Sequence, residues 1–200
     1  MHISEGVLSA PVLLSGGALT AAGVAVGLKT MDEKDIPKTA IIAAALFVAS
    51  LIHVPLGPTS VHLILNGIAG LILGWQIFPA FLVSLFLQSI LFQFGGLTAL
   101  GVNVLNVALP GIIAYYLFDF FKNRDNKIYL GIVSFISGAG AVLLTALMVA
   151  LSLNFTDQAF QEIAKMAVIS HFPLMIIEGI ISIFVVIFIK KVKPEIIKEG

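Results

Sequence analysis

Long runs of apolar residues constrain this chain more than any other feature of its sequence. Of its 200 residues, 59% are hydrophobic and only 11% are charged, whereas soluble domains carry roughly 25% charged residues. So few polar side chains could not cover the surface of a water-soluble protein, and apolar runs of this length are typical of transmembrane helices. The sequence therefore predicts an all-α integral membrane protein.

Charged residues, prolines and glycines divide the chain into apolar segments, seven in number, at 8–28, 39–54, 60–74, 76–94, 102–121, 128–153 and 167–189. The third segment has 15 residues, which would form a helix of about 22 Å at 1.5 Å per residue. That length is short of the hydrocarbon core of a bilayer, which is about 30 Å thick. We therefore expect about seven transmembrane helices in a single domain over 1–200, with the third helix short or broken.

Ten of the eleven basic residues lie in alternate connections between these segments, and only Lys165 lies in the other set. The ten are Lys29, Lys34, Lys38, Lys122, Arg124, Lys127, Lys190, Lys191, Lys193 and Lys198. Because Lys and Arg concentrate in cytoplasmic loops, we expect the N-terminus outside and the tail at 190–200 in the cytoplasm. This orientation brings the N-terminal residues and the connection at 54–61 to the same outer face.

The sequence does not support several classes of protein. There is no cysteine, so any metal ligand must be nitrogen or oxygen. The formal net charge of zero gives no reason to expect a nucleic-acid partner. Neither G-x-x-x-x-G-K-[ST] nor H-E-x-x-H occurs, so we expect no enzyme, and ATP hydrolysis would belong to partner subunits. A cleavable signal peptide needs a basic start, whereas this chain has Glu5 there.

The first two residues, Met1 and His2, can chelate a metal ion. The α-amine of Met1, the amide nitrogen between the two residues and the His2 imidazole together close two chelate rings. Three nitrogens then occupy three corners of a square, and planar four-nitrogen coordination suits Ni(II) or Cu(II), whereas zinc prefers tetrahedral sites. An imidazole from elsewhere in the chain would supply the fourth nitrogen.

The fourth ligand has two candidates, His53 and His62. Pro55 and Pro58 favour an extended connection between them, after which Thr59 or Ser60 resembles a helix N-cap. This pattern predicts His62 in the first turn of the third helix, where its side chain would be held firmly. His53 ends the second segment and could instead bond a backbone carbonyl, so His62 is the preferred candidate and His53 stays open.

Four further polar residues lie within the apolar segments. Asn103 and Asn106 share a helix face at i, i+3 and should face the bundle interior, either supporting the metal-binding segments or bonding between helices. His171 and Glu178 share a face of the last segment. An intramembrane carboxylate indicates a functional role, and we expect Glu178 to support the site or the fold. His171 is a candidate ligand for an incoming ion or a satisfied interfacial histidine.

Four stretches of the sequence carry a family resemblance. "MHISEGVLS" resembles the N-terminal "MHI-x-[DE]-G" of the CbiM/NikM family, the substrate-binding (S) components of energy-coupling-factor (ECF) transporters for cobalt and nickel. "PLGPTSVHLILNGIAGLILGW", "FGGLTALGVNVLNVALPG" and "HFPLMIIEG" resemble three further family segments in the same order. Together they extend from residue 1 to residue 179.

The resemblance implies a compact helical bundle whose N-terminal segment, residues 1–7, is inserted and completes a metal site. It implies ligation by Met1, His2 and His62, with Glu5 holding the inserted segment. From the residues alone, Glu5 is either an acceptor for the His2 ring or a solvated surface acid.

The implied function is capture of Ni(II) or Co(II) as transported substrate at the plasma membrane of a prokaryote. The implied partners are membrane lipid, a transmembrane coupling subunit, ATP-binding-cassette ATPase subunits and, as a further candidate, a small accessory membrane subunit. An S component for an organic vitamin and a channel or scaffold that works without ATP are the alternatives.

Overall fold

The computed structural model of the chain describes residues 2–56, 59–122 and 126–198. The helices are α1 (Ala10–Lys29), α2 (Ile36–Ala49), α3 (Asn66–Leu73), α4 (Ile77–Phe92), α5 (Leu100–Phe121), α6 (Lys127–Thr156), α7 (Gln161–Ser170), α8 (Phe172–Val192) and α9 (Glu195–Lys198). Short 3₁₀ turns, η1 (Glu33–Asp35), η2 (Gly74–Gln76) and η3 (Gln158–Phe160), join some of them. An antiparallel hairpin of β1 (His53–Leu56) and β2 (Thr59–His62) follows α2.

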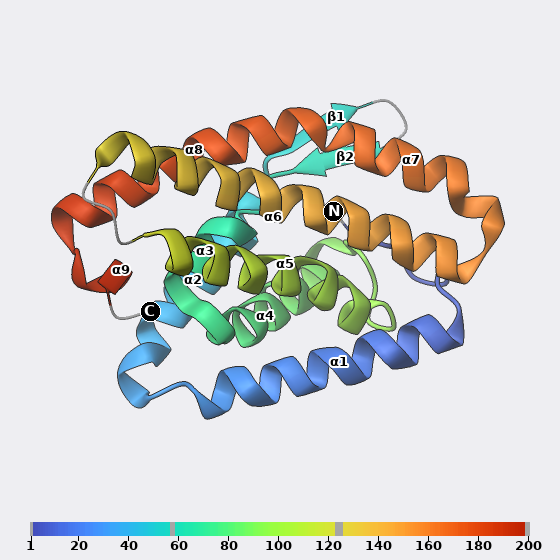
Figure 1. Cartoon of the computed structure of the whole chain (residues 1–200). Helices are drawn as coiled ribbons and strands as arrows, with labels where there is room; N and C mark the ends of the chain where they lie inside the picture. The colour runs from blue at the N-terminus through green and yellow to red at the C-terminus, as the bar shows by residue number, and fades with distance from the viewer. Residues whose placement is uncertain (1, 57–58, 123–125, 199–200) are drawn as a thin grey trace.

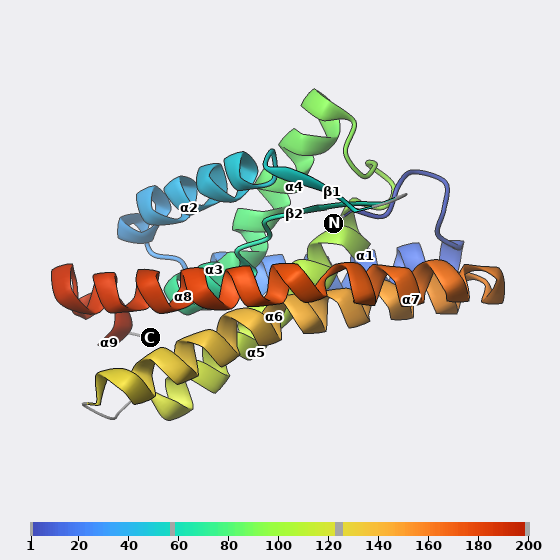
Figure 2. The same cartoon turned by 90° about the horizontal axis from the view of Figure 1, so that it is seen from above.

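Helix α5 is the centre of the bundle. It packs against α1, α3, α4 and α6, and α6 packs in turn against α8. Figure 1 shows α1, α5, α6 and α8 running roughly along the length of the molecule, with α1 on one side and α6 and α8 on the other, whereas Figure 2 shows α4 running across them. In the view from above, the hairpin lies between α4 and α8 (Figure 2). The main apolar core lies where α2, α3, α4 and α5 meet.

The expected number of membrane-spanning helices is not confirmed by the structure. Among the described residues, five helical stretches are long and apolar enough to cross a bilayer: Ala10–Lys29, Asn66–Phe92, Leu100–Phe121, Lys127–Thr156 and Gln158–Val192. The second expected segment forms α2, whose 14 residues extend only about 21 Å. The third and fourth expected segments form one stretch that contains α3, η2 and α4. The prediction of about seven spans is therefore not confirmed.

The short third helix was predicted correctly, but its start was not. Helix α3 has only eight residues and begins at Asn66, so His62 lies at the end of β2 rather than in the first turn of a helix. Leu65 adopts a left-handed backbone conformation, with φ of 55°, and a residue in this conformation interrupts a right-handed helix. The helix therefore cannot extend back to His62.

The basic connections gather at one end of the molecule. The end of α1, the start of α2, the end of α8 and α9 all lie at the left of Figure 1, whereas the turn between α6 and α7 lies at the right. A polar cavity at this end is lined by Lys34, Lys38, Trp75, Tyr116 and Ile196, among others. The alternation of charge along the sequence thus predicted correctly which connections share an end.

The buried side-chain amide of Gln76 links the elements at this basic end of the bundle. Gln76 donates from Nε2 to Asp35 Oδ2 over 2.9 Å, and its Oε1 accepts from Thr39 Oγ1 over 3.2 Å. The hydrogen bond from the backbone amide of Asp32, aided by that from Gln76, lowers the pKa of the Asp35 carboxyl below its usual value. These contacts fix the α1–α2 connection against the turn between α3 and α4.

Close helix contact at Gly70 gives a first prediction. A Cβ atom at Gly70 of α3 would collide with the carbonyl oxygen of Gly111 on α5, whereas a Cβ at Gly140 of α6 would meet no heavy atom within 4 Å. Gly70→Ala should therefore destabilise the protein by about 1–3 kcal/mol through overpacking. Gly140→Ala should be neutral or stabilising by about 0.5–1 kcal/mol, since alanine favours a helix. Thermal unfolding in detergent measures both, and equal midpoints for the two variants would contradict the assigned α3–α5 contact.

Candidate metal centre

The side chain of Asn103 on α5 forms hydrogen bonds with both the N–H and the carbonyl group of Ile3. Ile3 N donates to Asn103 Oδ1 over 2.9 Å, and Asn103 Nδ2 donates to the Ile3 carbonyl oxygen over 3.0 Å. Both residues are buried, so this pair of hydrogen bonds replaces the water that the peptide group would otherwise need. The pairing holds the N-terminal segment beside α5 at the residue directly after His2.

The connection between α4 and α5 supports the same segment. Glu5 N donates to the carbonyl oxygen of Gly95 over 3.2 Å, and Thr98 N donates to Glu5 Oε1 over 3.4 Å. Gly95 has φ of 80°, a conformation that side chains disfavour, and a Cβ at Gly96 would collide with the Glu5 carboxylate. The two glycines therefore leave the room that the N-terminal segment occupies. Of the two alternatives for Glu5, the hydrogen bond from the His2 ring stays a hypothesis.

The two histidines that the sequence placed on one face lie against each other. The ring centroids of His2 and His62 are 4.9 Å apart, with an angle of 26° between the ring planes. His2 also stacks on Phe94, at a centroid distance of 6.3 Å. His62 is buried and His2 is half-buried, so the pair is shielded from bulk solvent and the rings are brought together by packing.

The His62 ring is oriented by its neighbour in the chain. Its Nδ1 lies 3.0 Å from the carbonyl oxygen of Leu63. A carbonyl can only accept, so this contact requires hydrogen on Nδ1 and selects the tautomer whose Nε2 carries the lone pair. The arrangement therefore favours the His62 tautomer that carries its hydrogen on Nδ1.

Glu178 of α8 fixes the segment that follows His62. Its carboxylate accepts from Ile64 N through Oε1 and from Leu65 N through Oε2, the second over 2.9 Å. The side chain is 1% exposed, so these amides take the place of solvent around a buried carboxyl group. Glu178 was expected to support the site or the fold, and its position shows that it anchors the chain between β2 and α3.

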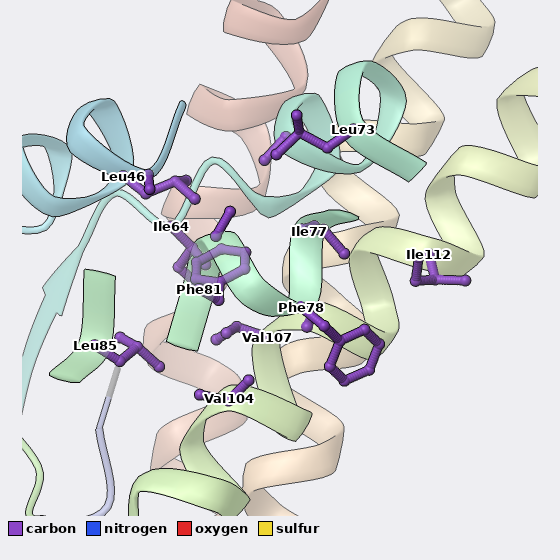
Figure 3. Packing of buried hydrophobic residues seen from close by; sticks show 14 of the residues in the cluster. Leu46, Ile64, Leu73, Ile77, Phe78, Phe81, Leu85, Val104, Val107 and Ile112 are labelled. Carbon is purple, nitrogen blue, oxygen red and sulfur yellow. The ribbon is translucent and has the colours of Figure 1, made fainter. Parts of the chain in front are cut away.

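A small cavity lies beside the two rings. Its volume is about 10 Å³, which is room for roughly one water-sized particle. Its polar lining comes from His2, His62, Ser50 and Gln88. Its apolar lining comes from Leu46, Leu63, Ile64, Phe81, Leu85 and Val107. Figure 3 shows five of these apolar side chains converging from α2, α4, α5 and the chain before α3.

The remaining predicted residues lie elsewhere or outside the described part. Asn106 bonds across to α6, where Ser152 Oγ lies 3.3 Å from its Nδ2. His171 is buried, with Nδ1 2.6 Å from the Ala167 carbonyl oxygen. Met1 lies outside the described residues, as do the side chains of His53 and Ser60, although the backbone pairs His53 with His62. The described residues contain no group of three or more His, Cys, Asp or Glu side chains arranged to hold a metal ion.

Sequence reasoning missed Gln88, although a signal was present. Gln88 lies one turn beyond Leu85 and two turns beyond Phe81 on α4, at i, i+4 and i+7 of one face. That face is otherwise apolar where it lines the cavity. An amide at a core position of a membrane helix needs a polar partner, and this need was the available signal.

The role of Asn103 can be tested by hydrogen exchange. Asn103→Leu removes two hydrogen bonds worth about 1 kcal/mol each, so amide exchange in the N-terminal segment should accelerate about tenfold or more. Asn106→Leu is the matched control, because it removes the same type of amide from the same helix while leaving the Ile3 contacts intact. Mass spectrometry of the N-terminal peptide measures the rate. Equal acceleration in both variants would show that the segment is not held by Asn103.

A family model and several known proteins are similar to this chain in sequence. The family model described as "Cobalt uptake substrate-specific transmembrane region" (CbiM) matches residues 2–196. A candidate metal transport protein of Haemophilus influenzae is 44% identical over 100% of this chain and 98% of its own length. A cobalt transport protein, CbiM, of Clostridium tetani is 30% identical over 96% of this chain and 85% of its own.

A solved structure supports the same assignment at the level of fold. The crystal structure of a truncated transition metal transporter matches with a TM-score of 0.75 at 26% identity, covering 96% of this chain and 99% of the other. Family model, relatives and fold all extend over nearly the full length of the chain. The chain therefore belongs to the CbiM family of cobalt uptake substrate-specific transmembrane regions.

Proposed function

We propose that the protein is the substrate-capture (S) component of an uptake transporter, and that it binds Ni(II) first and Co(II) second. The ligands would be the Met1 amine, the amide nitrogen between Met1 and His2, the His2 imidazole and His62 Nε2. The observation that carries this proposal is the stacking of the His2 and His62 rings, 4.9 Å apart, beside a cavity of single-ion size. Metal transport by the relatives named above points the same way.

The fixed position of Ile3 supports the proposed chelate. The chelate uses atoms of the first two residues, and the next peptide group is held on both sides by Asn103. Such a clamp reduces the freedom that the N-terminus would lose on binding an ion, and pre-organisation of this kind favours affinity. The amide nitrogen must lose its proton to bind, which requires a strongly Lewis-acidic ion. Ni(II) in a planar nitrogen field meets this requirement.

The proposal extends to the membrane and to partners. We place the ion site at the outer face of a prokaryotic plasma membrane and the basic end of the bundle in the cytoplasm, following the distribution of lysine and arginine. Since the chain has no phosphate-binding loop of the G-x-x-x-x-G-K-[ST] type, ATP hydrolysis would come from ATPase subunits acting through a transmembrane coupling subunit. The two alternatives, a vitamin-binding S component and a channel, find less support. At the histidine pair, the cavity of about 10 Å³ is far below the roughly 300 Å³ or more of organic ligand sites, so an organic vitamin does not fit at this place.

Nickel binding by protein with a native N-terminus tests the proposed function. His2→Phe keeps an aromatic ring at this position but removes the imidazole nitrogen and with it one chelate ring, so tight binding and the visible absorption band of planar Ni(II) should both be lost. A chain with one alanine added after Gly200 is the control and should bind like the native protein. Thermal unfolding in detergent establishes that each variant is folded. Equal binding by all three would rule out the N-terminal chelate and move the site to the other histidines and buried polar groups.

A further inference from the structure

The carboxamide of Gln88 is buried beside the two histidines. Gln88 is 1% exposed and lines the cavity together with His2 and His62. Phe81 and Leu85, on the same face of α4, form part of the apolar lining of that cavity. Gln88 therefore adds a polar group to an otherwise apolar face of α4, at the point where this face meets the histidine rings.

The two ends of the Gln88 amide differ in their surroundings. Nε2 donates to Ser84 Oγ over 3.0 Å, one turn back on α4. Oε1 has no hydrogen-bond partner among the described residues, although it is fully buried. Ser84 is not among the described residues that line the cavity, so the amino end of Gln88 is bonded to a residue outside the lining, and the oxygen is the end of the amide without a protein donor. A buried oxygen without a donor in an apolar setting is unfavourable unless a ligand completes it.

Ser50, which also lines the cavity, does have a hydrogen-bond partner. Its Oγ donates to the carbonyl oxygen of Phe47, three residues earlier in the chain, over 2.6 Å. The Gln88 oxygen is therefore an acceptor of the lining, in addition to the histidine ring nitrogens, that can interact with whatever occupies the space beside the rings. With room for about one water-sized particle, the occupant that fits is a single metal ion or a single water molecule.

We propose that Gln88 is a specificity-determining residue of the ion site, its carboxamide oxygen binding the captured ion as a fifth ligand. This inference rests on the proposed function. Ni(II) in a planar four-nitrogen field has its electrons paired, with a filled orbital perpendicular to the plane, so it gains little from a fifth donor. Co(II) has one electron fewer and binds a donor in that position. An oxygen at this place thus raises the affinity for Co(II) and leaves that for Ni(II) nearly unchanged, in line with the dependence of metal preference on geometry.

The test compares Ni(II) and Co(II) affinities of the native protein, Gln88→Leu and Gln88→Glu. Gln88→Leu removes the oxygen and should lower Co(II) affinity about 10–100-fold, the range seen for groups around a metal site, with Ni(II) affinity changed less than about threefold. The visible spectrum of bound Co(II) should change as the fifth ligand is lost. Gln88→Glu keeps an oxygen at the same length and should retain Co(II) affinity at or above the native level. Asn106→Leu removes a buried amide away from the cavity lining and should leave both affinities unchanged.

Each other outcome has a distinct meaning. Equal losses for both ions in Gln88→Leu would assign Gln88 a structural role and overturn the inference, as would unchanged affinities and spectra. Loss of Co(II) binding in a folded Gln88→Glu protein would also overturn it, which keeps the test decisive where Gln88→Leu does not fold. If the native protein binds neither ion, the proposed function fails. If the native protein binds both ions and the Gln88 variants match it, only this inference fails.

Discussion

The pair of hydrogen bonds between the Asn103 side chain and the Ile3 peptide is the contact on which the candidate site depends. It joins the start of the chain to the central helix at the residue directly after His2. Each hydrogen bond of this kind contributes about 1 kcal/mol, but its value rises where water is excluded. Without this contact, the residues next to His2 would be held by ring stacking and by the hydrogen bonds between Glu5 and the α4–α5 connection.

His62 is positioned by a different set of contacts. His62 lies at the end of a short hairpin, and a hairpin of two strands is marginally stable on its own. Glu178 supplies the missing support, because its carboxylate accepts from the backbone amides of Ile64 and Leu65. The same contact explains how the start of α3 is tolerated inside an apolar protein, where free backbone amides need an internal acceptor. The two ring positions are thus set by α5 on one side and α8 on the other.

Much of this arrangement could be predicted from the sequence, and the rest depended on three-dimensional contacts. Apolar length predicted a helical membrane protein, and the alternation of lysines predicted which connections share an end. The proximity of His2 and His62 followed from that alternation. The element that carries His62 was predicted wrongly, because the N-cap pattern at Thr59 and Ser60 is local, whereas hairpin pairing and the conformation of Leu65 depend on neighbours outside the pattern.

Asn103 and Asn106 also show that a local sequence pattern does not determine which segment a side chain contacts. Asn103 and Asn106 have the same chemistry and share a helix face, yet one clamps the N-terminal segment and the other bonds to Ser152 of α6. A difference of one helical turn decides which segment each amide meets, and no spacing rule contains that information. Likewise, the expected count of about seven spans is not confirmed, because apolar composition does not reveal that α2 ends after 14 residues or where the helices α3 and α4 begin and end.

The hydrogen bonds from residue 3 to residue 103 span 100 positions of the chain, which has a consequence for the order of assembly during synthesis. The N-terminal residues leave the ribosome first, but their partners on the hairpin, on the α4–α5 connection and on α5 are made much later. Contacts so distant along the chain form after local ones. These early residues are therefore among the last to find their place, and a growing chain that has not yet produced α5 cannot form the candidate site.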